Sequence, residues 1–71
     1  MLVKKLPIEK ITELAARKNV KKIAVENFLA SVDGQPYDNA MGNLEIDAQA
    51  YGWNAATQKA IRDGIEYSRK L

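Results

Sequence analysis

Residues 15–28 read AARKNVKKIAVENF, and this stretch decides how the N-terminal half of the chain folds. A single continuous helix through it would place Lys18 and Lys21 in the apolar stripe formed by the residues around them. Asparagine tolerates the left-handed backbone conformation, so a turn at Asn19 keeps both lysines out of the core. The stretch therefore predicts two helices, over residues 7–18 and 20–32.

Two further helices are predicted downstream. The run DGQP at residues 33–36 is a strong turn signal. Gly52 is typical of the glycine that ends a helix, and Asn54 of the N-cap that begins the next one. The helices on either side are expected over residues 37–51 and 55–70. Since no stretch shows the alternation of a strand, the fold class expected is all-α, a small bundle of four short helices.

The whole chain, residues 1–71, is expected to form one domain, with residues 1–5 as a flexible N-terminal tail. The predicted core consists of apolar residues that recur on one face of each helix. They are Ile11, Leu14, Ala15, Val25, Phe28, Leu29, Leu44, Ala48, Trp53 and Ile61.

Composition excludes several classes of site. The chain has no cysteine and no histidine, which excludes disulfides, thiolate chemistry, ordinary zinc sites and histidine-based catalysis. No apolar run approaches the about 20 residues that a membrane span needs, and no hydrophobic stretch follows the first lysines as in a signal peptide. We therefore expect no membrane association and a cytoplasmic location. Small domains often gain stability from a partner chain, which makes a homodimer one hypothesis.

Charge is unevenly distributed along the chain. Residues 1–22 hold seven basic and two acidic side chains, a balance of +5, whereas residues 23–71 hold four basic and seven acidic ones, a balance of −3. A basic end of this kind can meet phosphate groups or an acidic protein surface, or it can be a solvated face that keeps the protein soluble.

The interval Ile11–Ser31 resembles the core signature of the helix-turn-helix family. Ala15 is the small residue where the two helices cross, and Asn19 lies in the turn where glycine is usual. The apolar residues inside the second helix are Val20, Val25 and Phe28. Lys18 stands where the family usually carries an apolar residue. The resemblance implies a DNA-binding regulator whose second helix enters the major groove.

On this hypothesis the side chains that contact DNA fall into two groups. Lys10, Arg17 and Lys18 would lie on backbone phosphates, which set affinity rather than sequence choice. Lys21 and Lys22 would meet phosphates or guanine edges. Asn27 would pair with an adenine edge, and the apolar Ile23 would be exposed on the same face.

An ordinary helical hairpin shows similar spacings, which leads to a second hypothesis, a protein-interaction bundle. The helix around Asn19–Leu29 resembles the last helix of ubiquitin-associated modules. Tyr51-Gly52-Trp53 is similar to the Met-Gly-Phe loop of that family, although here the loop follows the helix. On this hypothesis the binding surface is either the acidic C-terminal half of the chain or the corner at Tyr51 and Trp53, which are then the candidate partner-binding residues. DNA binding would be favoured by an exposed face of Lys21, Lys22 and Asn27 that is continuous with Lys10 and Arg17. An exposed apolar patch around Tyr51 and Trp53 would favour a protein partner.

We expect no catalytic activity, no cofactor and no metal site. Ser31 and Ser68 have no histidine to activate them, and the four glycines are scattered rather than gathered in a phosphate-binding loop. A shift of 33 residues also places Asn19 over Gly52 and Phe28 over Ile61. Either two related helical hairpins or chance in an alanine-rich helical chain explains this similarity.

Overall fold

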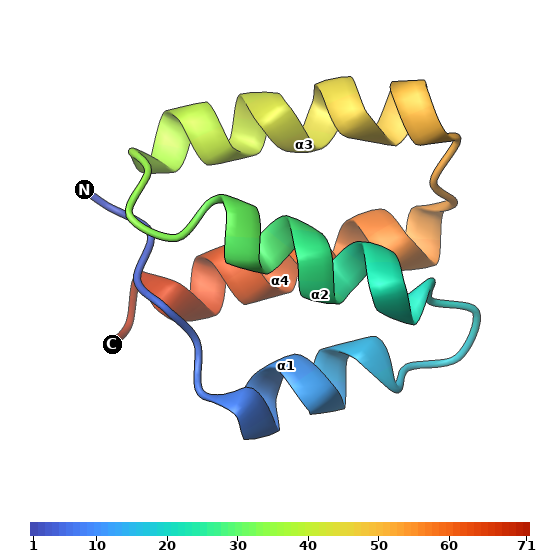
Figure 1. Cartoon of the computed structure of the whole chain (residues 1–71), viewed down its shortest axis with the longest axis horizontal. Coiled ribbons are helices and arrows are strands. Elements are labelled where there is room, and N and C mark those ends of the chain that lie inside the picture. Colours follow the sequence, from blue (N-terminus) through green and yellow to red (C-terminus); the bar gives the residue numbers. More distant parts are fainter.

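The computed structural model describes all residues, 1–71, and has the all-α architecture that the sequence predicts. Four helices follow one another in an up-down-up-down order, with α1 and α3 running one way and α2 and α4 the other (Figure 1). Their bounds are α1 Ile8–Ala15, α2 Lys22–Ser31, α3 Tyr37–Tyr51 and α4 Ala55–Ser68. Their buried faces meet in one hydrophobic core, as in other small helical bundles.

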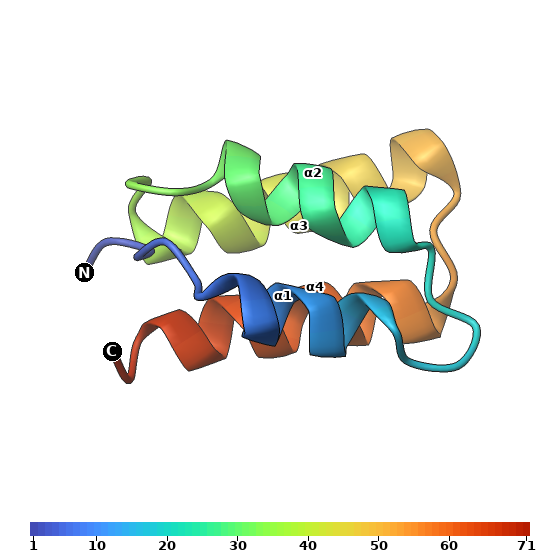
Figure 2. The same cartoon turned by 60° about the horizontal axis from the view of Figure 1, so that its bottom comes forward.

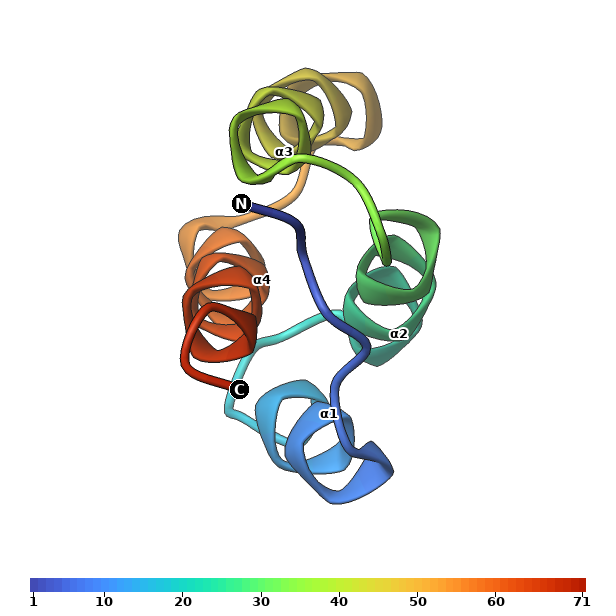
Figure 3. The same ribbon diagram turned by 90° about the vertical axis from the view of Figure 1, so that its left-hand side faces the viewer.

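The four helices are not packed equally. α4 contacts each of the other three helices, and α1 also packs against α2, whereas contact between α2 and α3 is slight. Seen end-on, α1 and α3 lie at opposite extremes with α2 and α4 between them (Figure 3). The bundle is therefore tightly closed between α1, α2 and α4, and looser where α3 faces α2.

The turn between α1 and α2 is longer than predicted. Asn19 has the expected positive φ, +65°, but α1 ends at Ala15 rather than residue 18, and α2 begins at Lys22 rather than residue 20. The amide N–H groups of Arg17 and Val20 each bond to the carbonyl oxygen three residues back, at 3.4 and 3.3 Å, which is the tight geometry of a helix end. α4 likewise ends at Ser68, two residues before the predicted boundary.

The α3–α4 connection has the predicted caps. Gly52 takes a left-handed conformation with φ +66°, and the Asn54 Oδ1 atom accepts the Thr57 amide N–H at 2.9 Å. The same asparagine donates from Nδ2 to the Asn19 carbonyl oxygen at 2.8 Å, and the Lys21 amide N–H donates to the Thr57 hydroxyl at 2.9 Å. The two connections therefore lie side by side at one end of the bundle (Figure 2).

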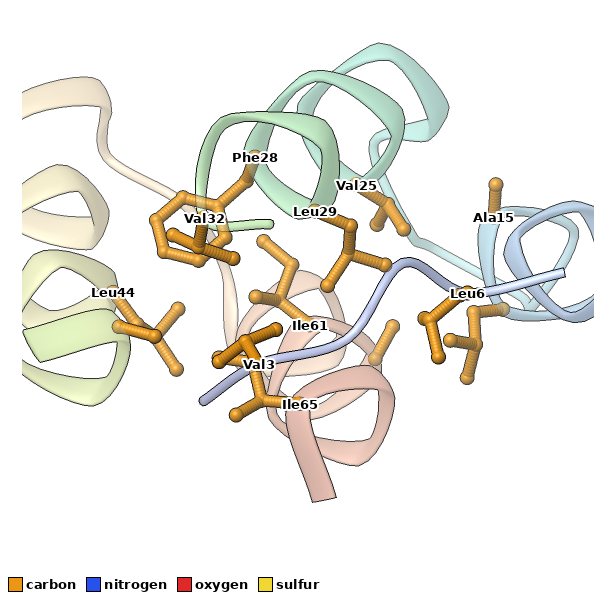
Figure 4. Close-up of a cluster of buried hydrophobic side chains, with 13 residues drawn as sticks. Val3, Leu6, Ala15, Val25, Phe28, Leu29, Val32, Leu44, Ile61 and Ile65 are labelled. Carbon is orange, nitrogen blue, oxygen red and sulfur yellow. The ribbon is translucent and has the colours of Figure 1, made fainter. Parts of the chain in front are cut away.

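The core confirms most of the predicted residues and adds others. Ile11 and Trp53 are only partly buried and pack at its edge, which corrects their placement in the core. The core residues that the prediction missed are Val3, Leu6, Val32, Ala40, Ala60 and Ile65 (Figure 4). The backbone of Gly64 sits so close to α1 and α2 that an added Cβ would lie 2.9 Å from Leu29 Cδ1 and 3.1 Å from Leu14 Cδ1.

The N-terminal residues, expected as a flexible tail over residues 1–5, are packed onto the domain in the structure. Val3 is buried, and its amide N–H donates to the Gln35 carbonyl oxygen at 2.8 Å. The Val3 carbonyl oxygen accepts the Gly34 N–H at 2.8 Å, and the Met1 carbonyl oxygen accepts the Tyr37 N–H at 2.9 Å. Figure 4 shows Val3 beside Ile65. Pairing with a distant loop leaves no helical periodicity in the sequence, so pattern reasoning could not detect it.

Candidate binding groove between α2 and α3

The slight contact between α2 and α3 leaves a surface groove of about 580 Å³. One wall comes from α2, and the other from the C-terminal half of α3 and the residue that follows its capping glycine. The lining residues are Lys21, Ile23, Ala24, Asn27, Phe28, Ser31, Asp47, Tyr51 and Trp53.

Aromatic rings form one end of this groove. The Trp53 ring meets the buried Phe28 ring edge-to-face, with centroids 5.8 Å apart, and stacks on the Tyr51 ring at 5.6 Å. Tyr51 is 66% exposed and Ile23, on the opposite wall, is 65% exposed. Large apolar surface is thus continuous from the core, through Trp53, to the solvent.

Local backbone geometry brings the two aromatic rings of α3 and its turn together. α3 ends in a Schellman-type cap, in which Gly52 turns left-handed and the Trp53 amide N–H donates to the Ala48 carbonyl oxygen at 2.9 Å. This reversal folds Trp53 back beside Tyr51, the last residue of the helix. A side chain other than glycine at position 52 would strain this conformation.

The lysines near the groove have no acidic partner within the chain. Lys18, Lys21 and Lys22 are exposed and form no ion pair. Lys21 is the N-cap residue of α2, whose first turn contains no acidic side chain. Cations are unfavourable at a helix N-terminus, which carries partial positive charge. The end of the groove next to the α2 N-terminus is therefore electropositive.

Two of the predicted DNA-contacting residues are engaged elsewhere. Arg17 forms an ion pair with Asp63 at 2.6 Å, and this hydrogen bond lowers the pKa of the Asp63 carboxyl. Lys10 pairs with Glu13 at 3.0 Å and its Nζ atom lies 4.6 Å from the centroid of the Tyr67 ring. These three partners, Asp63, Glu13 and Tyr67, belong to α1 or α4, so Arg17 and Lys10 are both engaged in contacts within the domain.

The structure brings the remaining predicted residues into one place. Lys21 and Asn27 from the DNA hypothesis and Tyr51 and Trp53 from the protein-interaction hypothesis all line the groove. Lys18 and Lys22 are exposed in the adjoining turn and at the start of α2. The sequence analysis did not single out Ala24, Phe28, Ser31 or Asp47 as site residues, because their contribution depends on how α3 is placed against α2. Ile23 could be identified from the sequence, because it is an apolar residue on the outward face of the second predicted helix.

The groove offers a definite chemistry to a ligand. It combines aromatic and aliphatic surface with a few polar groups, namely the Asn27 amide, the Ser31 hydroxyl and the Asp47 carboxylate. Such a lining takes up apolar groups and orients them by hydrogen bonds at its rim.

Comparisons with protein-family models, with curated proteins and with solved structures return no significant match. None of the four helices combines the length and the apolar character required to cross a membrane.

Proposed function

We propose that this chain is a small, non-catalytic protein-binding module whose α2–α3 groove takes up apolar side chains of a helical segment from a partner protein. The observation that carries the proposal is the exposure of Ile23 and Tyr51, at 65% and 66%, on the two walls of a groove that also exposes Trp53. Contiguous apolar surface with a polar rim is typical of interaction sites, and tyrosine and tryptophan are enriched among the residues that dominate binding energy.

A helix is the partner structure that this groove favours. The two walls belong to adjacent antiparallel helices that make little contact with each other (Figure 3). An amphipathic helix laid between them would bury its apolar face, in the helix-in-groove mode of recognition. Small residues on α2, Ala24 and Ser31, leave room for the approach of a third backbone.

The proposal can be tested by selection from a displayed library of random peptides of about 16 residues, enough for four helical turns. The wild-type protein serves as bait, and binders of the Ile23→Glu variant are removed by counter-selection. Trp53 is the only tryptophan in the chain. Its fluorescence therefore reports on the groove when a selected peptide without tryptophan is titrated.

We expect amphipathic helical peptides that shift the Trp53 emission and that lose binding to Ile23→Glu. The matched control is Ile46→Glu, because Ile46 is 66% exposed on α3 but lies outside the groove. Retained binding by Ile46→Glu is expected. If selection yields no peptide that distinguishes Ile23→Glu from Ile46→Glu, the groove is not a protein-binding site.

DNA binding by the α1–α2 hairpin is a second candidate function. It is supported by the exposure of Lys18, Lys21, Lys22 and Asn27 and by the absence of ion pairs at the three lysines. The engagement of Arg17 by Asp63 counts against it. The test is titration onto a fluorescent duplex at several salt concentrations, with Lys21→Ala/Lys22→Ala alongside. Binding that weakens steeply with salt and in the variant would support this function, and no binding at low salt would exclude it.

A further inference from the structure

We infer that the partner segment carries acidic side chains at the end that lies next to Lys21, beside the apolar residues that enter the groove. This inference rests on the proposed function and specifies the chemistry of its partner. It predicts an amphipathic helix with a charge asymmetry along its length rather than a uniformly apolar or basic one.

The first support is the positive charge at the end of the groove next to the α2 N-terminus. Lys21, which lines the groove, and Lys22 occupy the N-cap and first position of α2, where partial positive charge from the helix makes acidic residues favourable instead. Lys18 adds a third cation in the turn before them. No carboxylate of the chain lies within ion-pair distance of any of the three. Acidic groups of a partner would relieve this repulsion.

The second support is the opposite charge of the α3 wall. No basic residue occurs between positions 23 and 58, and α3 carries Asp38, Glu45 and Asp47, none of them in an ion pair. Of these, Asp47 lines the groove. An acidic side chain is repelled beside Asp47 and attracted beside Lys21. The groove therefore favours one position for the acidic end of the partner, and this charge pattern sets the orientation of the bound helix.

The inference can be tested on the peptides that depend on the groove, that is, those lost with Ile23→Glu and kept with Ile46→Glu. We expect aspartate and glutamate to be enriched at one end of these peptides. The charge-reversal variant Lys21→Glu/Lys22→Glu should bind them about tenfold more weakly at low ionic strength. The ratio of the dissociation constants of variant and wild type should fall toward unity at high salt.

A matched control carries the same change of net charge at the opposite end of the molecule. Lys5→Glu/Lys70→Glu alters two exposed lysines without ion pairs, near the termini (Figure 1). We expect this variant to bind the peptides within about twofold of the wild type, because exposed charges farther away than a Debye length of about 10 Å are screened. Circular dichroism of both variants checks that they are folded.

Several outcomes would overturn the inference. Groove-dependent peptides that are neutral or basic would contradict it while leaving the proposed function in place. Absence of groove-dependent peptides would contradict both the inference and the proposed function. Sedimentation that shows a dimer dissociated by Ile23→Glu, but not by Ile46→Glu, would identify a second copy as the occupant instead. Salt-dependent duplex binding lost in Lys21→Glu/Lys22→Glu, without groove-dependent peptides, would assign the lysines to nucleic acid.

Discussion

Two contacts between helices in this small bundle differ sharply. Where α4 meets α1 and α2, Gly64 allows such close approach that the methyl groups of Leu14 and Leu29 lie where a Cβ would need space, and both leucines are buried. Where α2 faces α3, contact is slight and Ile23 and Tyr51 stay exposed. The closed contact provides stability, whereas the open one leaves exposed the surface on which the proposed recognition depends. Substitutions in the two regions should therefore change different properties.

The largest effect is expected in the closed contact. Leu14 is completely buried there, so Leu14→Ala removes apolar contacts and leaves a cavity. We expect a loss of about 2–5 kcal/mol in the free energy of unfolding, which approaches the total stability of about 5 kcal/mol common for a domain of this size. Urea denaturation measures it, with Leu2→Ala at an exposed position as the control. A loss no larger than that of the control would mean that the contact is not tightly packed.

A smaller effect should distinguish two helical glycines. Gly42→Ala introduces a methyl group with no neighbour within 4 Å, so the better helix propensity should raise stability by about 0.5–1 kcal/mol. Gly64→Ala brings the same methyl group to 2.9 Å from Leu29 Cδ1, and overpacking should place its stability about 1–3 kcal/mol below that of Gly42→Ala. Thermal or chemical unfolding of both variants tests this; equal stabilities would show that the leucines move aside freely.

The ion pair that spans the outside of the closed contact should give a modest dependence on pH. The Arg17 guanidinium, through its hydrogen bond, holds the pKa of Asp63 below the ordinary 3.8. The stabilisation is therefore present above that value and is lost as the pH falls through the lower pKa of the folded state. Because both side chains are about one-third exposed, Asp63→Asn should cost only about 0.2–1 kcal/mol at neutral pH.

The same variant should flatten the stability profile in acid. Stability of the wild type and Asp63→Asn is compared by urea denaturation from neutral pH to below about pH 4, and the difference between them should shrink as the pH falls. A difference that stays constant or grows would assign the effect of the substitution to something other than the charged pair.

The smallest effect on stability is expected in the groove. Ile23 is largely exposed, so Ile23→Glu should leave the free energy of unfolding within about 0.5 kcal/mol of the wild type while it abolishes groove-dependent peptide binding. Chemical denaturation and peptide titration of one preparation measure both properties. A large loss of stability would show that the groove also supports the core, and it would contradict this separation of the two properties.

Local signals in the sequence predicted much of the fold. The bounds of α3 follow from Pro36 and from Gly52, and Asn54 predicted the start of α4, because each residue acts on backbone within its own turn. Asn19 likewise has the left-handed conformation expected of it. The connections at Asn19 and Gly52, and the starts of α2 and α4, are each 33 residues apart, as in the internal similarity.

The candidate site was predicted less completely because it depends on packing between distant segments. The bond between Arg17 and Asp63 joins residues 46 positions apart, and it pairs one of the predicted DNA-contacting residues with a carboxylate of α4. The groove exists because α3 packs on α4 rather than on α2. Helical periodicity shows which face of a helix is apolar, but it does not show which neighbour covers that face. Hence Tyr51 and Lys21 were identified separately, in two hypotheses, and not as one site.

The central position of α4 has a consequence for synthesis of the chain. Ribosomes build proteins from the N-terminus at about 5–20 residues per second, so α1, α2 and α3 emerge before the helix that all three contact. Until Ile61 and Ile65 arrive, Leu14, Leu29 and Leu44 lack the part of the core that α4 supplies. The core therefore stays incomplete until α4 has been synthesised, and α4 then joins α3 to the α1–α2 pair in one folded domain.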